Sequence, residues 1–284
     1  MFLIVGANSQ IGSATARIIK ERDERLVTTT RRVSEANADQ LHLDFEQPIE
    51  TFTVPTGVTA ACIFVAMARL AACEADPVGS ARVNIERTLA LVDLLTAKGV
   101  YTLFLSTNQV FDGDEPRVSA ETMTSPVSEY GRQKAETERG LRARMANGMP
   151  IGILRLAKVV SPGMALIDAW KRDLTAGRSI RAFNDMTMAP TPVDLVAKSI
   201  THMMEDHLPV VAQLTGPRDV AYNEVGRFLA ERIGADPNLV EPVSAIENGV
   251  PKGSAPRNTT LDSSYIAERY SLIVPDAYDV IGKL

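Results

Sequence analysis

The chain has few of the residues that mark several protein classes. It contains only two cysteines, Cys62 and Cys73, among 284 residues, which is too few for a disulfide scaffold. Both lie in the alanine-rich stretch "ACIFVAMARLAAC", and we interpret them as small buried core residues rather than as a functional pair. Because no CxxC spacing occurs and cysteine is scarce, we expect a reducing compartment and a cytoplasmic protein.

Long apolar runs and a positive net charge are also absent. No run approaches the roughly 20 residues needed to span a bilayer, and the opening "MFLIVG" resembles a strand rather than a signal peptide. The net charge is −5 with a pI near 5.4, so no nucleic acid is expected as a partner. Without a long apolar run, no membrane is expected as a partner either. His42, His202 and His207 are scattered without metal-ligand spacing, so we assign no metal.

The first half of the chain alternates apolar runs with helix-length segments. Strands are expected at 2–5, 25–30, 41–43, 61–66, 101–105 and 151–156, and helices at 10–21, 79–98 and 128–146. Continuous apolar strands separated by helices indicate a parallel sheet that is covered on both faces. We therefore predict an α/β fold with a doubly wound parallel sheet of the Rossmann type.

The second half has a different rhythm, with frequent proline and glycine. Helices are expected at 164–176, 193–205 and 221–233. We interpret residues 1–160 as a dinucleotide-binding Rossmann domain and residues 161–284 mainly as a smaller α+β substrate lobe. Later segments are expected to return to the large sheet.

The stretch "VGANSQIGSA" follows the first expected strand and opens a helix. Gly6 and Gly12 have the spacing of loops that let a backbone approach a dinucleotide pyrophosphate, and a helix N-terminus directs free N–H groups at phosphates. Ser9 replaces the common middle glycine but is small and can donate a hydrogen bond. The alternative is a βα turn that binds no ligand. The position of this stretch directly after the first strand favours dinucleotide binding.

The end of the second strand reads "TTTRR", with Thr29, Thr30, Arg31 and Arg32. NAD-specific proteins tend to place a carboxylate there for the ribose 2′-hydroxyl, whereas arginine pairs with a 2′-phosphate. We therefore expect Arg31 and Arg32 to bind NADP, with NAD as the alternative cofactor. Both arginines have the alternative interpretation of solvated surface charges.

Two further stretches carry candidates for acid–base chemistry. Tyr130 and Lys134 share one face of the expected helix 128–146, where an ammonium would lower the phenol pKa from about 10 and let the tyrosine exchange a proton with a carbonyl oxygen. A Tyr-x-x-x-Lys pair is common by chance, so context decides. Thr107 follows the strand 101–105, at the sheet edge where ligands bind in open α/β folds, and its hydroxyl can hold a substrate oxygen.

With these residues in this order, the chain resembles the extended short-chain dehydrogenase/reductase superfamily, and most closely dTDP-4-dehydrorhamnose reductase and related sugar-nucleotide-binding proteins. The matching stretches are "GANSQIG", "DPVGSARVNIERTLALVDLL", "STNQVFDG", "YGRQKAETE", "ILRLAKVVSPG", "PTPVDLVAKSI" and "APRNTTLDSS". They extend over nearly the whole chain.

The resemblance implies a catalytic set of Thr107, Tyr130 and Lys134, with Lys134 also on the nicotinamide ribose. It also implies a cofactor site, whose residues would be Gly6, Asn8, Ser9, Gln10, Ile11, Gly12, Asp44, Ala66 and Ala68. Asn84 resembles a helix asparagine that supports the site from behind. Each supporting residue has an alternative role in packing or capping.

The residues after Thr107 depart from the relatives. Sugar-nucleotide dehydratases carry Asp-Glu there and the reductases carry Asp-Tyr, whereas this chain has Asn108 and Gln109. Amides keep the shape of carboxyl groups but cannot transfer protons near neutral pH, so dehydration by that route is disfavoured. Simple hydride chemistry remains feasible.

The substrate lobe offers candidates of several kinds. Lys158, Trp170 and Arg257 are candidate substrate residues, together with Asn108 and Gln109; Trp170 has helical spacing that also fits a core position. Lys158 directly follows an apolar strand, where burying a charge is expensive, so we expect it to face the cleft.

We therefore predict an NADP(H)-dependent reductase of a keto-sugar, with a nucleotide-linked sugar as its small-molecule substrate. Two alternatives remain. One is a sugar-nucleotide epimerase that retains NAD, and the other is a non-catalytic dinucleotide-binding regulatory subunit. A homodimer is compatible with such a fold.

Overall fold

The large sheet of the computed structural model, which describes residues 1–251 and 254–284, has seven strands in the order β11-β6-β5-β4-β1-β2-β3. In that order the strands are Val211–Leu214, Ile151–Leu156, Tyr101–Thr107, Ala60–Ile63, Phe2–Val5, Leu26–Thr30 and Gln40–His42. Every neighbouring pair is parallel. The predicted doubly wound parallel sheet is confirmed, because strand order reverses between β1 and β4.

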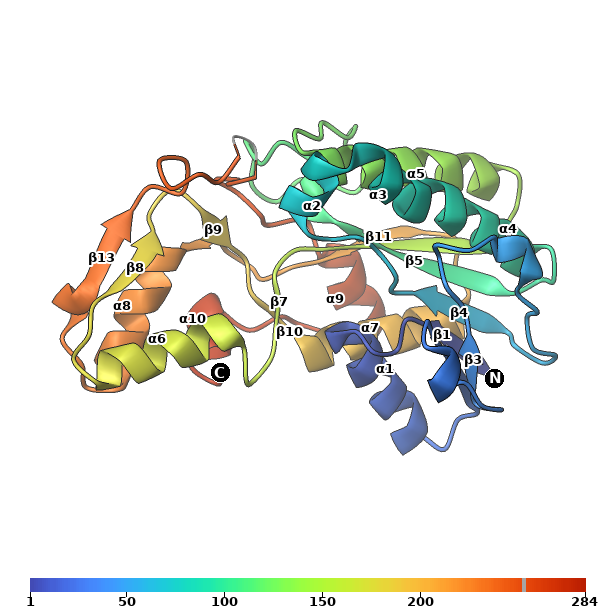
Figure 1. The fold of residues 1–284 in the computed structure, drawn as a ribbon, viewed down its shortest axis with the longest axis horizontal. Coiled ribbons are helices and arrows are strands. Elements are labelled where there is room, and N and C mark those ends of the chain that lie inside the picture. Colours follow the sequence, from blue (N-terminus) through green and yellow to red (C-terminus); the bar gives the residue numbers. More distant parts are fainter. Residues whose placement is uncertain (252–253) are drawn as a thin grey trace.

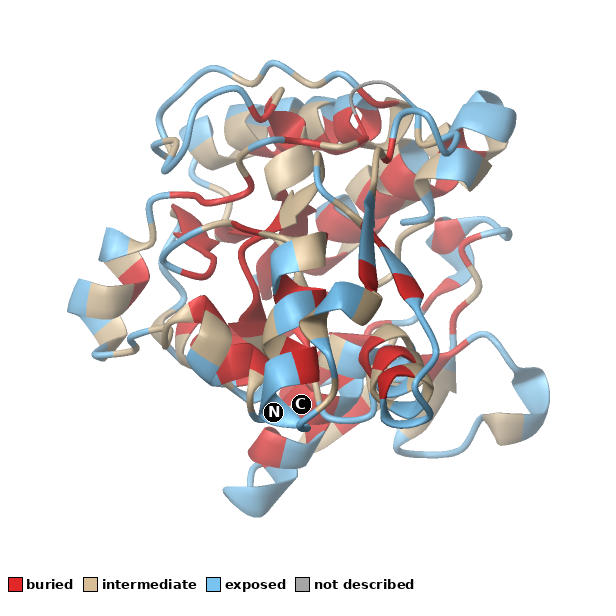
Figure 2. Ribbon diagram, turned by 90° about the vertical axis from the view of Figure 1, so that its left-hand side faces the viewer, coloured by how far each residue is buried: buried red, intermediate tan, exposed pale blue. Residues whose placement is uncertain are grey.

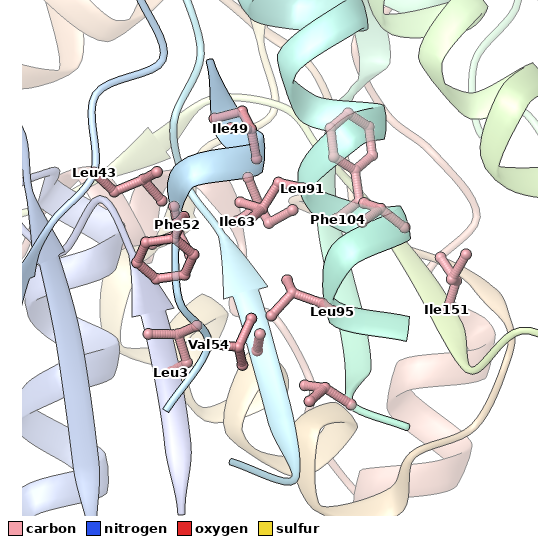
Figure 3. Close-up of a cluster of buried hydrophobic side chains, with 14 of the residues drawn as sticks. Leu3, Leu43, Ile49, Phe52, Val54, Ile63, Leu91, Leu95, Phe104 and Ile151 are labelled. Atoms are coloured by element: carbon pink, nitrogen blue, oxygen red, sulfur yellow. The ribbon is translucent and has the colours of Figure 1, made fainter. Parts of the chain in front are cut away.

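Helices cover both faces of this sheet (Figure 1). One layer contains α2 (Leu70–Ala75), α3 (Pro77–Ala81), α4 (Thr88–Thr96) and α5 (Glu129–Ala146), and the other contains α1 (Gln10–Glu21), α7 (Val193–Asp206) and α9 (Ser264–Tyr270). Successive strand residues point to opposite faces, so Leu3 and Val5 join one buried cluster while Phe2 and Ile4 join the other. Figure 3 shows the first cluster between the sheet and α4.

The smaller lobe lies at one end of the molecule, on the left in Figure 1. It contains α6 (Ala165–Thr175), α8 (Tyr222–Arg232), α10 (Ala277–Ile281), β8 (Ile180–Phe183) parallel to β13 (Val240–Val243), and β9 (Thr187–Met188) antiparallel to β12 (Val220–Ala221). A separate apolar core forms among these elements around Trp170 and Leu229. Between the two parts, β7 (Val159–Val160) pairs with β10 (Thr191–Pro192), and α7 and β11 return the chain to the large sheet.

One helix differs from the sequence prediction. The expected helix 79–98 is divided into α3, a π-helical turn η3 (Arg82–Arg87) and α4. A π turn widens the helix and re-aims its side chains, and such turns are frequent at functional sites. Here the turn contains Asn84, whose side chain is buried. Among the described residues, four one-turn 3-10 helices occur in connections: η1 (Val33–Glu35), η2 (Ile49–Thr51), η4 (Asn108–Val110) and η5 (Pro237–Leu239).

Burial follows the layered arrangement, with buried residues on the sheet and on the inward faces of the helices (Figure 2). The expectation that Cys62 and Cys73 are buried, unpaired thiols is confirmed. The core also contains a buried ion pair between Arg155 of β6 and Glu138 of α5, with side chains 0% and 1% exposed. Within the described residues, no helix has both the length and the apolar character needed to cross a membrane.

Candidate active site

Thr107 is the last residue of β5, at the carboxyl edge of the sheet. It caps the 3-10 turn η4 (Asn108–Val110), because its Oγ1 accepts a hydrogen bond from the backbone N–H of Gln109 at 3.2 Å. The same hydroxyl lies 3.4 Å from Asn108 Oδ1, to which it can donate. The turn therefore fixes the Thr107 hydroxyl where the strand ends, although the residue itself is largely buried.

The start of α5 packs directly against this turn. Ser128 caps the helix by accepting from the N–H of Gly131 at 3.1 Å, and its hydroxyl donates to Gln109 Oε1 at 3.4 Å. A Cβ on Gly131 would collide with the Gln109 carbonyl oxygen. The glycine after Tyr130 thus permits the close approach that brings the first turn of α5 beside the residues following Thr107.

Lys134 occupies the buried side of α5. Its Nζ donates to the carbonyl oxygen of Leu105 at 2.6 Å and lies 4.0 Å from the centroid of the Phe104 ring. Burial lowers the pKa of Lys134 to about 7, although Glu138 acts in the opposite direction. The ammonium therefore ties α5 to β5 two residues before Thr107.

The electrostatics of Tyr130 differ from the sequence-based expectation. Burial raises the pKa of the Tyr130 phenol, and the nearby Cys73 thiol adds to the increase. Lys134 does not counteract this, since its ammonium is directed to Leu105 and Phe104. The phenol consequently keeps its proton throughout the neutral range, which suits a group that donates a proton.

A buried amide network lies behind this pair, between η3 and α5. The Asn84 side chain accepts from the N–H of Met67 at 2.9 Å and donates to the Met67 carbonyl at 3.1 Å and to Gln133 Oε1 at 2.7 Å. Gln133 in turn donates to Ser80 Oγ at 2.7 Å and Glu129 Oε1 at 2.9 Å. The network links the wall after β4 to the helix that carries Tyr130, which agrees with a supporting role for Asn84.

A cavity of about 430 Å³ adjoins the glycine loop at the same edge of the sheet. Its lining includes much of the predicted cofactor set, and the full lining is Gly6, Asn8, Ser9, Thr29, Thr30, Arg31, Leu43, Asp44, Phe45, Glu46, Phe64, Val65, Ala66, Met67 and Val83. Of the predicted cofactor residues, Gln10, Ile11, Gly12, Arg32, Ala68 and Lys134 are not part of that lining. The size suits the adenosine part of a dinucleotide better than the whole molecule.

The glycine loop itself fits a phosphate-binding cradle. Gly6 has φ of +90°, and a Cβ there would lie 2.9 Å from the Val65 side chain. Gly12 is equally constrained, because a Cβ would lie 2.7 Å from the Gly6 carbonyl and from Ser9 Oγ. Ser9 caps α1 by accepting from the N–H of Gly12 at 3.0 Å. Gln10 Nε2 donates to Ser161 Oγ at 2.8 Å, linking the loop to the segment after β7.

The two predicted cofactor arginines have different surroundings. Arg31 lines the cavity. Arg32 instead pairs with Glu35, with 2.6 Å between Nη1 and Oε1. Sequence reasoning did not single out Glu35, which the turn η1 brings back to the strand end; the i,i+3 spacing of Arg32 and Glu35 was the available signal.

The predicted substrate residues are scattered more widely. Asn108 and Gln109 are half-buried beside Thr107, and Lys158 is half-buried after β6 with its pKa lowered by burial. Trp170 is 7% exposed and packs edge-on against Tyr222 in the core of the smaller lobe, which favours the packing alternative. Arg257 is exposed, and its carbonyl accepts from Thr187 Oγ1 at 2.9 Å.

The C-terminal stretch "APRNTTLDSS" lies against the loop that follows the Thr107 turn. Asn258 Nδ2 donates to the carbonyl oxygens of Gly113 and Asp114 at 3.1 and 2.9 Å. The N–H of Arg117 donates to the Thr260 carbonyl at 3.0 Å. The C-terminal stretch therefore packs against the loop that follows β5, although the two segments lie far apart in the sequence.

Comparison with known proteins gives a consistent result. The family described as RmlD substrate binding domain matches residues 1–280. A probable low-salt glycan biosynthesis reductase, Agl14 of Haloferax volcanii, is 24% identical, covering 99% of this chain and 96% of that protein. A dTDP-4-dehydrorhamnose reductase structure from Clostridium acetobutylicum superposes with a TM-score of 0.83 at 18% identity, covering 99% and 96% of the two chains. Another from Bacillus anthracis, in complex with NADP, has a TM-score of 0.80 at 16% identity, covering 99% and 97%.

Proposed function

Because the chain belongs to the RmlD substrate binding domain family, we propose that it is an NADP(H)-dependent reductase of a nucleotide-linked keto-sugar. The observation that carries the proposal is the packing of the turn after Thr107 against the N-terminal turn of α5 that bears Tyr130. The Asn84 side chain links this helix to Met67, which lines the cavity beside the glycine loop. The names of the relatives support the substrate class, and the NADP complex of one structural neighbour supports the cofactor.

In this proposal Tyr130 is the proton donor. A carbonyl that is reduced gains negative charge on its oxygen, and a phenol with a raised pKa holds the proton that the oxygen needs. Thr107 presents a hydroxyl fixed by η4, which donates to the same oxygen and stabilises its charge. Positioned proton transfer of this kind contributes about 10²- to 10⁴-fold to a rate.

NADPH supplies the hydride when bound. The residues proposed to hold it are those of the glycine cradle and cavity, with Gly6, Asn8 and Ser9 on the phosphates and Arg31 near the adenosine ribose. The N-terminus of α1 adds free N–H groups and a favourable dipole for anionic groups. Lys134, whose Nζ donates to the Leu105 carbonyl, is proposed also to hold the nicotinamide ribose.

The two amides restrict the chemistry. Gln109 accepts from Ser128 and Asn108 lies within reach of Thr107 Oγ1, so both act as hydrogen-bonding groups that carry no titratable proton. Water elimination needs an acid and a base at these positions in the dehydratases that the chain resembles. Reduction without dehydration is therefore the proposed reaction.

The test is incubation with NADPH carrying deuterium at the transferred position, across a panel of nucleotide-linked keto-sugars. The proposal expects net NADPH consumption and one deuterium in the sugar product. A Thr107→Val variant should lose most of this activity, and Thr107→Ser should recover it. Retention of NAD through purification with no net NADPH consumption would replace the proposal with the epimerase alternative, and cofactor binding without turnover of any keto-sugar would replace it with the regulatory one.

We also propose that the protein acts in the cytoplasm as a homodimer without nucleic acid or membrane partners. The acidic net charge of −5 supports the absence of a nucleic-acid partner. Light scattering of the purified protein measures the mass, and a monomeric value of 30.8 kDa would remove the dimer from the proposal.

A further inference from the structure

The end of β2 presents a carboxylate that strand-end reasoning does not identify. Glu35 closes the turn η1, which follows the strand. Its Oε2 accepts a hydrogen bond from Thr30 Oγ1 at 3.0 Å, and its Oε1 pairs with Arg32 Nη1 at 2.6 Å. The backbone N–H of Arg32 also donates to Thr30 Oγ1 at 3.2 Å. The turn therefore folds the carboxylate back onto the last residue of the strand.

This carboxylate lies at the rim of the cavity beside the glycine loop. Thr30, which donates to it, is one of the lining residues, and Asn8 is another. The Arg32 guanidinium and the Thr30 hydroxyl hold the pKa of Glu35 below its usual value, and a hydrogen bond from the Asn8 side chain acts in the same direction. An ionised carboxylate thus stands between two residues that line the cavity.

The pairing also makes the two arginines unequal. Arg32 is engaged by Glu35, whereas Arg31 lines the cavity and forms no ion pair within the described residues 1–251 and 254–284. A ribose 2′-hydroxyl can donate a hydrogen bond to a carboxylate, but a 2′-phosphate carries negative charge that the carboxylate repels. A ribose 2′-phosphate in this site would pair with Arg31, but it would compete with Glu35 for the guanidinium of Arg32.

We propose that Glu35 sets the preference between the two nicotinamide nucleotides, by favouring a free 2′-hydroxyl and opposing the attraction of Arg31 and Arg32 for a 2′-phosphate. The inference rests on the proposed function in that the cavity binds the adenosine ribose. Its consequence is that the native protein accepts NADH alongside NADPH, and that removal of one carboxylate makes it selective for NADPH.

The test is isothermal titration of NADP⁺ and NAD⁺ into the full-length protein and its variants, with the ratio of the two dissociation constants as readout. Glu35→Gln keeps the shape of the side chain and removes its charge. It should shift the ratio toward NADP⁺ by at least about fivefold, because the 2′-phosphate no longer faces a like charge. Arg32→Met should shift the ratio in the opposite direction.

Asp39→Asn is the matched control, because Asp39 is an exposed carboxylate in the same β2–β3 connection that does not line the cavity. It should change the ratio by less than about twofold, since a solvated charge outside the site is screened. An unchanged ratio in Glu35→Gln, with tight binding of either nucleotide, overturns this inference alone. Failure of the wild type to bind either nucleotide overturns the proposed function as well.

Discussion

The buried pair of Arg155 and Glu138 allows a quantitative prediction about the support of the site. The guanidinium binds both carboxylate oxygens, with 2.7 Å between Nη2 and Oε2 and 3.0 Å between Nε and Oε1. It also donates to the Ala120 carbonyl at 3.2 Å and to Gln213 Oε1 at 3.1 Å. The pair therefore joins β6, α5, β11 and the loop beyond the Thr107 turn.

Glu138→Gln leaves the Arg155 charge buried without its counter-ion. Breaking a buried pair in this way costs about 3–5 kcal/mol, a large part of the roughly 5–15 kcal/mol that stabilises an average domain. Urea unfolding followed by circular dichroism measures the loss as a lower midpoint with an unchanged slope. Glu136→Gln on the same helix is the control, because its pair with Arg139 is exposed and is worth about 0–1 kcal/mol.

A second comparison identifies the reason for the cost. The double variant with Glu138→Leu and Arg155→Met removes both charges, so it should recover part of the stability lost in Glu138→Gln. Recovery stays incomplete because Ala120 and Gln213 each lose a donor, at about 1–3 kcal/mol for a buried acceptor left unpaired. A loss below about 1 kcal/mol in Glu138→Gln would refute the reasoning.

Three further predictions address the site. Gly131→Ala should destabilise the protein by about 1–3 kcal/mol in thermal melts, because the added methyl group overpacks against Gln109, and it should reduce turnover. Gly140→Ala on the same helix is the control. Its methyl group meets only side-chain atoms of Leu89 and Arg144, so its stability should be nearly unchanged. Between pH 7 and 10.5 the unfolded state binds more protons at Lys134 than the folded state, so the free energy of unfolding should rise by about 1.4 kcal/mol per pH unit. In urea titrations, Lys134→Met should remove this rise. The same dependence of unfolding free energy on pH in the variant and the native protein would contradict the burial of the ammonium. Because the pKa of Tyr130 is raised, its alkaline loss of kcat/KM for reduction should lie above pH 10. A loss centred near pH 8 that persists in Lys134→Met would exclude this phenol as the proton donor.

The central strands were predictable because buried parallel strands are continuous apolar runs. β1 and β6 have the predicted bounds, and β5 extends two residues beyond 101–105 to include Thr107. The strand β11 was not predicted; its buried Gln213 is polar because it receives a hydrogen bond from Arg155. A local pattern cannot reveal a residue whose partner lies 58 positions away.

In the candidate site, too, local features could be predicted and contacts between distant residues could not. The positions of Thr107, Tyr130 and the glycine loop followed from strand ends and helix starts, which are local properties. The direction of Lys134 toward Leu105 and the π turn around Asn84 depend on tertiary contacts. The return of Glu35 to Thr30 is local, through the turn η1, and its signal was the i,i+3 spacing of Arg32 and Glu35. Helical spacing placed Tyr130 and Lys134 on one face but could not show that burial would dominate both pKa values.

The most direct test of the central claim is a single-turnover measurement of NADPH oxidation by the native protein and by Tyr130→Phe, with an accepted keto-sugar nucleotide. The variant removes one hydroxyl and leaves the cofactor cradle intact, so NADPH should bind with an unchanged dissociation constant while the rate of oxidation falls by at least about 10²-fold. An unchanged rate in Tyr130→Phe would contradict the assignment of this phenol as the proton donor.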